Sequence, residues 1–182
     1  TRDGYQKLEF ANNLNSEQKP VWVRKHYAEE NMVCIPDTEP VKFGTNKPLG
    51  SYWIDKYEVS NGEYAEFIAA GGYLQEALWG FEVKTLDDRK IDFSQIAEEF
   101  VDATGQPGPS TWRNGTYPTG EEDFPVTGVS WYEAMAYAKF VGKELPTIYH
   151  WNFAKYGDSQ VAGRFSNLAT DGLAPRGRFK GI

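Results

Sequence analysis

The chain has 182 residues, 40% of them hydrophobic and 15% aromatic, which suffices for one compact domain with a single core. Its net charge of −7 and pI near 4.9 argue against general binding to nucleic-acid phosphates, which needs clustered Lys and Arg. No apolar run approaches the roughly 20 residues of a membrane span and no signal segment opens the chain, so we expect no membrane span in this segment.

The N-terminal segment, residues 1–31, is polar and mixed in charge, and it is predicted to be an arm with one helical stretch. Because the first residue is Thr1 and not Met, we expect a processed product or a piece of a longer protein. From Met32, the runs "MVCIP", "VKFG" and "YWIDKYEVS" are rich in β-branched and aromatic residues and predict strands. The lone Cys34 lies in the first run and is interpreted as a buried apolar side chain rather than a reactive thiol.

A short amphipathic helix is predicted after Ser60. Ser60 and Glu63 have the spacing of a capping box, in which each side chain accepts a hydrogen bond from the other residue's backbone amide. Tyr64 and Phe67 give the helix an apolar face, and Gly71-Gly72 supply its stop.

Residues 73–123 contain one periodic piece, "DFSQIAEEFVDA", and otherwise consist of turn-forming sequence. Loops this long in a compact domain are functional or disordered. Aromatic side chains spread through the segment predict packed loops, because disordered segments lack such residues. These side chains are Trp79, Phe81, Trp112 and Tyr117. "Asn114-Gly115-Thr116" is interpreted as a tight turn rather than a glycosylation acceptor.

Two more helices are predicted near the C-terminus. Ser130 and Glu133 repeat the capping box, and the helix that they start is predicted to end at Gly142. We expect Trp131 and Tyr137 to be buried on its apolar face.

Thr147 is predicted to cap the second of these helices. His150 stands where Glu or Gln would complete its capping box, and this departure is either functional or a matter of local packing. The chain after Gly157 is predicted to be loop.

Catalytic motifs are scarce. His26 and His150 are the two histidines and neither belongs to a metal-binding spacing, so a zinc site is not predicted. The phosphate-loop, dinucleotide-binding and nucleophile-elbow patterns are absent from the sequence. Acidic clusters such as "EED" at 121–123 are interpreted as solvated surface rather than a calcium site.

Three stretches, in order, resemble the formylglycine-generating enzyme, or sulfatase-modifying factor, family. They are "DKYEVSNGEYAEFIAAGGY" (55–73), "TWRNGTYPTG" (111–120) and "FPVTGVSWYEAMAYAKFVGKELPT" (124–147). The resemblance implies an α+β fold with long loops and low regular secondary structure, the family's variant of the C-type-lectin-like fold. "TGQPGPSTWRNGTYPTG" and "LPTIYHWNFA" further resemble the branch associated with bacterial serine/threonine protein kinases.

The resemblance also divides the chain into an arm at 1–31 and the N-terminal part of the family domain at 32–182, without the domain's C-terminal part. Enzymes of the family bind copper on a pair of cysteines and, with oxygen, oxidise a sulfatase cysteine to formylglycine. Those cysteines and the family's calcium loops belong to the C-terminal part, and Cys34 matches neither cysteine. We therefore assign no catalytic residue, metal ligand or cofactor to this segment.

What the resemblance assigns is a set of ligand-binding residues at the rim of a cleft. They are Tyr73, Glu76, Trp79, Trp112 and Arg113. Aromatic and Arg side chains also anchor interfaces, because they bury large area with few lost rotamers.

The sequence and the resemblance together predict one of three functions. The first is a non-catalytic ligand-binding or sensor module, part of a serine/threonine protein kinase-linked or cell-surface protein, for a peptide, protein or carbohydrate ligand. The alternatives are a partial formylglycine-generating oxidase and an accessory protein of the bacterial envelope. The compartment is left open, cytoplasmic or extracytoplasmic in a bacterium. Because a fold cut at Ile182 would expose apolar surface, we expect an oligomer or pairing with a missing C-terminal segment.

Overall fold

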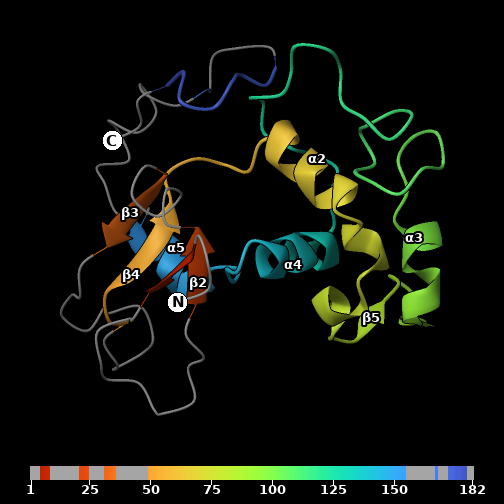
Figure 1. The fold of residues 1–182 in the computed structure, drawn as a ribbon, viewed down its shortest axis with the longest axis horizontal. Coiled ribbons are helices and arrows are strands. Elements are labelled where there is room, and N and C mark those ends of the chain that lie inside the picture. Colours follow the sequence, from red (N-terminus) through yellow and green to blue (C-terminus); the bar gives the residue numbers. More distant parts are fainter. Residues whose placement is uncertain are drawn as a thin grey trace.

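The computed structural model describes the backbone of residues 5–8 and 21–24 and, with side chains, residues 31–35, 49–154, 167 and 172–179. Helices and small antiparallel sheets make this part of the chain an α+β fold in which loops predominate (Figure 1). The α-helices are α2 (Asn61–Ala69), α3 (Ile96–Glu99), α4 (Trp131–Phe140) and α5 (Ile148–Ala154), and the 3-10 turns are η1 (Gly72–Leu74), η2 (Glu76–Trp79) and η3 (Phe93–Gln95). None of the described helices has the length and apolar character needed to cross a membrane.

The described strands form three separate antiparallel pairs. They are β1 (Tyr5–Leu8) with β2 (Val21–Arg24), β3 (Met32–Ile35) with β4 (Tyr52–Asp55), and β5 (Val83–Lys84) with β6 (Lys90–Ile91). Two of the predicted strands are thereby confirmed as β3 and β4, whereas the predicted strand "VKFG" lies outside the described residues. The described residues of the N-terminal arm form the β1–β2 pair and not a helix.

Both serine capping boxes are confirmed. In α2, Ser60 Oγ accepts from the Glu63 amide at 3.2 Å and Glu63 Oε2 accepts from the Ser60 amide at 3.0 Å. In α4, Ser130 and Glu133 make the same two bonds at 3.2 and 2.6 Å. Gly71, with φ of +73°, follows α2 in the left-handed conformation that the predicted stop requires.

The core lies where α2, α4, η1, η2 and α3 meet, and it is built from rings. Tyr64 of α2 stacks on Tyr137 of α4 with 5.4 Å between ring centroids. Trp112 enters from a loop, 2% exposed, and its Nε1 donates to Asn61 Oδ1 at 3.0 Å. The prediction that the aromatic loops are packed is confirmed.

The loop that carries Trp112 is organised by Asp102, a carboxylate that is 5% exposed. Its Oδ1 accepts from the Thr104 amide and hydroxyl, both at 2.7 Å, and from the Gln106 amide at 3.0 Å. Its Oδ2 accepts from the Gly115 amide at 2.7 Å. Burial alone would raise the pKa of Asp102, but these hydrogen bonds outweigh it and lower that pKa to about 2.

The predicted Asn114-Gly115 turn is confirmed. Both residues have positive φ, and Arg113 and Thr116 exchange backbone hydrogen bonds at 3.0 and 3.2 Å on either side of the turn.

Two burial predictions are wrong. Cys34 is exposed, because it pairs with Trp53 on a face of the two-stranded β3–β4 ladder where both side chains reach solvent. Trp131 is 61% exposed, whereas Tyr137 is 7% exposed as predicted. Trp131 and Tyr137 are six positions apart, and six helical residues make one full turn plus roughly 240°. The two side chains therefore point to different faces of α4.

Candidate functional site

A pocket of about 370 Å³ opens between η2 and the β5–β6 pair. Its lining residues are Glu76, Trp79, Gly80, Phe81, Glu82, Val83, Lys90, Ile91, Asp92, Phe93 and Ile96. They come from one continuous stretch, 76–96, which folds back on itself through the β5–β6 turn. The pocket therefore belongs to the long segment that the sequence marks as packed loop.

The floor of the pocket is Trp79, which is fixed on several sides. It is 4% exposed, its Nε1 donates to the Gly72 carbonyl at 3.0 Å, and its ring stacks on Phe100 at 5.5 Å. Tyr73 of η1 packs against it at 5.6 Å. A ring held by a hydrogen bond and two aromatic neighbours is preorganised, so a ligand would not have to order it.

Phe81 forms an aromatic wall. It stacks on Tyr132 of α4 at 6.1 Å and meets Trp131 edge-on at 6.2 Å. The Nζ atom of Lys139 lies 4.7 Å from the centroid of the Phe81 ring, in a cation–π contact. The Phe81 ring thus already contacts one cationic side chain, that of Lys139.

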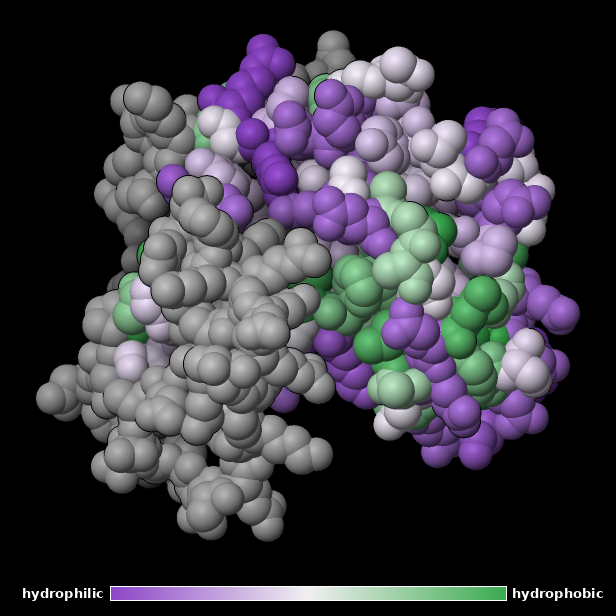
Figure 2. Space-filling view, viewed as in Figure 1, coloured by the Kyte–Doolittle hydropathy of each residue, from purple (hydrophilic) through white to green (hydrophobic). Residues whose placement is uncertain are grey.

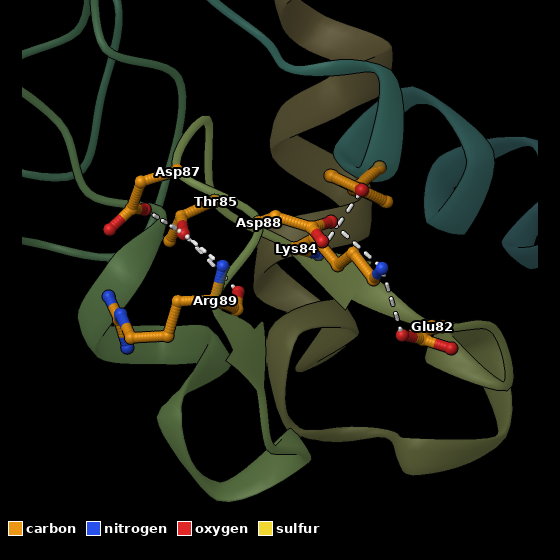
Figure 3. Close-up of polar contacts among 7 residues, drawn as sticks. Glu82, Lys84, Thr85, Asp87, Asp88 and Arg89 are labelled. Atoms are coloured by element: carbon orange, nitrogen blue, oxygen red, sulfur yellow. Dashed lines mark hydrogen bonds and ion pairs between the residues drawn. The ribbon is translucent and has the colours of Figure 1, made fainter.

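The opposite wall is the β5–β6 pair, which Figure 3 shows with its polar contacts. Lys84 Nζ lies 2.8 Å from Asp88 Oδ1 and 3.5 Å from Glu82 Oε1. Across the turn, Thr85 Oγ1 accepts from the Arg89 amide at 3.1 Å. The backbone amide of Lys84 donates to the Tyr132 hydroxyl at 3.1 Å, which ties this wall to α4.

The rim of the pocket is acidic. Three carboxylates line it, those of Glu76, Glu82 and Asp92, against the single ammonium of Lys90. All four of these residues are exposed, while Val83, Ile91 and Ile96 beneath them are buried. Figure 2 shows hydrophobic residues gathered over α4 and β5 with hydrophilic residues beside them. The ammonium groups of Lys84, beside Glu82, and Lys139, beside Phe81, offset part of this negative charge. An apolar hollow lined by exposed carboxylates can take a ligand that is both apolar and cationic.

The five predicted ligand-binding residues do not share one place. Glu76 and Trp79 line the pocket together, whereas Tyr73, Trp112 and Arg113 do not line it. Tyr73 lies in the core behind Trp79, and Arg113 is exposed beside the Asn114-Gly115 turn. Ligand contact by any of the five stays a prediction.

The sequence did not identify the other residues that line the pocket. These include Phe81, Glu82, Asp92 and Phe93. The sequence predicts Phe81 to be a packed aromatic residue and does not mark it as part of a site. The signal that was present is the density of aromatic and acidic residues between 76 and 96, which carries no helical or strand period.

A buried hydrogen-bonded chain supports the pocket from behind. The Tyr73 hydroxyl donates to Glu133 Oε1 at 2.6 Å and lies 3.1 Å from the Tyr64 hydroxyl. Burial raises the pKa of Glu133, an effect that the hydrogen bonds from Ser130 and Tyr73 oppose. Burial also raises the pKa of Tyr73, so its hydroxyl remains a donor at neutral pH. This chain holds η1 against α4 and faces the core rather than the pocket.

The residues described here do not supply the copper site that the family resemblance implies. That site needs two cysteines, and the 182 residues contain only Cys34, which is exposed on β3. In the described part of the chain, no group of three or more His, Cys, Asp or Glu side chains is placed to hold a metal ion.

Comparison with known proteins gives one family. A family model described as the sulfatase-modifying factor enzyme 1-like domain matches residues 22–173. A formylglycine-generating enzyme of Bos taurus is 33% identical over 124 residues, which cover 62% of this chain and 32% of that protein. A hercynine oxygenase of Mycobacterium tuberculosis is 29% identical over 139 residues, 69% of this chain and 29% of that protein.

A third relative, from Bos taurus, carries the name inactive C-alpha-formylglycine-generating enzyme 2. It is 32% identical over 128 residues, 65% of this chain and 41% of that protein. The chain spans between about a third and somewhat under half of the length of the formylglycine-generating enzymes that it matches. Relatives named as enzymes and a relative named as inactive thus share this segment.

Proposed function

This chain belongs to the sulfatase-modifying factor enzyme 1-like family, and from that premise we propose that it is a non-catalytic ligand-binding module. The observation that carries the proposal is the pocket at residues 76–96, a preorganised aromatic hollow with an acidic rim. Support also comes from a relative named as inactive. Fold membership alone does not decide function, so the site has to be tested directly.

The ligand class follows from the chemistry of the pocket. Phe81 and Phe93 offer partly exposed aromatic surface above the buried Trp79, and the rim carboxylates of Glu76 and Glu82 add negative charge. An Arg or Lys side chain of a peptide has an apolar stem, which can pack on the aromatic surface, and a cationic head, which can pair with the carboxylates. A neutral carbohydrate would use the ring faces but gain nothing from the carboxylates. We therefore propose a peptide or protein ligand that places a basic side chain in the pocket.

The wider setting is also a proposal. We take the fold to be the family's variant of the C-type-lectin-like fold and residues 32–182 to be the N-terminal part of that domain, after an arm at 1–31. We place the module in a protein linked to a bacterial serine/threonine kinase or displayed at a cell surface. Sequence likeness in "TGQPGPSTWRNGTYPTG" is the support for the kinase-linked branch.

The binding test is a titration of the full chain followed by amide chemical shifts. Nα-acetyl-arginine amide and Nα-acetyl-lysine amide are expected to shift the amides of Gly80 and Phe81, while Nα-acetyl-glutamate amide and N-acetylglucosamine are not. Glu76→Gln and Glu82→Gln should each weaken binding by about two- to fivefold, the range of an exposed ion pair. Glu66→Gln, which removes an exposed carboxylate from α2, is the matched control and should leave the affinity unchanged. Equal shifts with the acidic probe would overturn the assignment.

The alternative is part of a formylglycine-generating oxidase, which the relatives of that name favour. It is tested by incubating the chain with a sulfatase-motif peptide, copper and oxygen and measuring aldehyde by mass spectrometry. We expect none, and aldehyde formation in proportion to enzyme would reject the non-catalytic proposal. An accessory protein of the bacterial envelope is the remaining candidate, and no described contact favours it over the first.

A further inference from the structure

The N-terminus of α5 carries a capping box like those of α2 and α4, and this one is completed by a histidine. The His150 amide donates to Thr147 Oγ1 at 3.3 Å, and the Thr147 amide donates to His150 Nδ1 at 3.3 Å. Thr147 Oγ1 and His150 Nδ1 are also 2.7 Å apart. The pair of reciprocal bonds is the one that Ser60 and Glu63 make in α2, with an imidazole nitrogen in place of a carboxylate oxygen.

This geometry fixes the state of the imidazole. A backbone amide can only donate, so His150 Nδ1 must present a lone pair to the Thr147 amide, and the ring proton must reside on Nε2. The Thr147 hydroxyl then donates to the same nitrogen while it accepts from the His150 amide. The neutral Nε2–H tautomer is therefore the form that closes the box.

Protonation would act against the cap in two ways. A proton on Nδ1 removes the acceptor of the Thr147 amide, although the Thr147 hydroxyl can still accept from the protonated nitrogen. It also places a positive charge in the first turn of α5, where the helix dipole is already positive. The two glutamate boxes behave differently, because a carboxylate at that position is favourable throughout the neutral and mildly acidic range.

We propose that His150 is a pH-sensitive part of the cap of α5: the neutral ring closes the first turn of the helix, and protonation at mildly acidic pH opens it. This makes α5 the one described helix whose capping box responds to pH in that range. The role does not depend on ligand binding at residues 76–96.

The surroundings of the ring agree with this role. The described titratable group that faces the imidazole from a neighbouring element is the phenol of Tyr52 on β4, with ring centroids 4.7 Å apart. The Tyr52 hydroxyl donates to the His150 carbonyl at 2.7 Å, and burial raises the pKa of Tyr52, so it stays neutral through the relevant range. Burial lowers the pKa of His150. The neutral form of His150 is thus favoured in the folded chain, and the stability that it contributes is lost as the pH falls below the ordinary histidine pKa of 6.5.

The test compares amide hydrogen exchange in the full chain at about pH 7.5 and about pH 5.5, corrected for the intrinsic pH dependence of exchange. Loss of the cap hydrogen bond, together with one unfavourable charge–dipole interaction, is expected to reduce protection of the Trp151 amide by roughly two- to fivefold at the lower pH. That amide donates to the Thr147 carbonyl at 3.0 Å and so reports the first turn of α5. The Tyr64 amide, which bonds the Ser60 carbonyl at 3.0 Å, reports α2 in the same sample and should not change.

Two variants separate the cap from general acid sensitivity. His150→Gln supplies an acceptor that does not titrate and should keep the Trp151 amide equally protected at both values of pH. His150→Ala lacks the acceptor and should show low protection at both. Imidazole carbon shifts provide an independent readout and should report the Nε2–H tautomer at neutral pH. An Nδ1–H tautomer, or a pH response in His150→Gln as large as in the wild-type chain, would overturn the proposal.

Discussion

Replacing Asp102 by Ala should loosen the loop that carries Trp112 into the core. The Asp102 carboxylate accepts four hydrogen bonds, three from backbone amides and one from the Thr104 hydroxyl. Those bonds join residues 102–106 to the Asn114-Gly115 turn, so that the two ends of the loop close on one side chain. Alanine keeps the backbone but leaves all four donors without this acceptor.

The size of the effect follows from the exposure of the donors. A hydrogen bond to a charged group contributes about 1.5–3 kcal/mol, but Thr104 and Gln106 are exposed and water can replace their partner. The Gly115 amide is less exposed and loses the most. We therefore expect Asp102→Ala to lower the free energy of unfolding by about 3 kcal/mol. Asp102→Asn retains the Oδ1 acceptor and turns an amide group toward the Gly115 amide, so about half of that loss is expected.

Urea unfolding followed by circular dichroism measures the effect, with Glu98→Ala, an exposed carboxylate on α3, as the control. The pKa of Asp102 in the fold is about 2, below its ordinary value of 3.8. Its stabilisation is thus complete above the ordinary value and is lost as the pH falls toward the folded one. The wild-type chain and Asp102→Ala should differ most at about pH 5, and the difference should shrink as the pH falls toward about 2. A loss below about 0.5 kcal/mol, or a difference that does not shrink with acid, would refute the reasoning.

Two further predictions concern the ring core. Tyr137→Ala should lower the free energy of unfolding by about 3–5 kcal/mol, because the Tyr137 side chain is 7% exposed. Trp131→Ala should lower it by under about 1 kcal/mol, because the Trp131 side chain is 61% exposed. Equal urea midpoints for the two variants would contradict this. Tyr73→Phe should cost about 1–3 kcal/mol, since it removes the donor to buried Glu133 without removing the ring. Thermal unfolding of Tyr73→Phe beside the double variant with Glu133→Gln tests whether the loss comes from this bond, and additive losses would show that it does not.

The elements that sequence predicted well are those whose signal is local. The Ser60–Glu63 and Ser130–Glu133 boxes lie within four residues, and both helices begin where the boxes place them. The Asn114-Gly115 turn is equally local, since both residues tolerate positive φ. Burial is not local, and it failed for Cys34 and Trp131, because nothing within either segment tells which face of a two-stranded ladder or a helix meets the core.

The pocket could not be predicted from the sequence either, because its lining also depends on burial. Its lining shows neither the helical nor the strand period, so no pattern tells that Glu76, Glu82 and Asp92 rise above a floor made by Trp79. The resemblance to a family pointed to this region, and it named Glu76 and Trp79. It did not separate the residues that line a hollow from Tyr73 and Trp112, whose rings are used by the core.

The contacts that hold the core join segments far apart in the chain. Trp112 bonds Asn61 across 51 residues, and Tyr73 bonds Glu133 across 60. Closing such long loops costs entropy before any contact compensates for it, so we expect this domain to fold slowly compared with helical bundles of its size. Since α4 provides Tyr137 and Glu133 to rings that come from α2 and η1, a nascent chain released before α4 is complete would hold those rings without their partners. Acquisition of structure should therefore wait for the last third of the sequence, and until then the aromatic segments would be targets for chaperones and proteases.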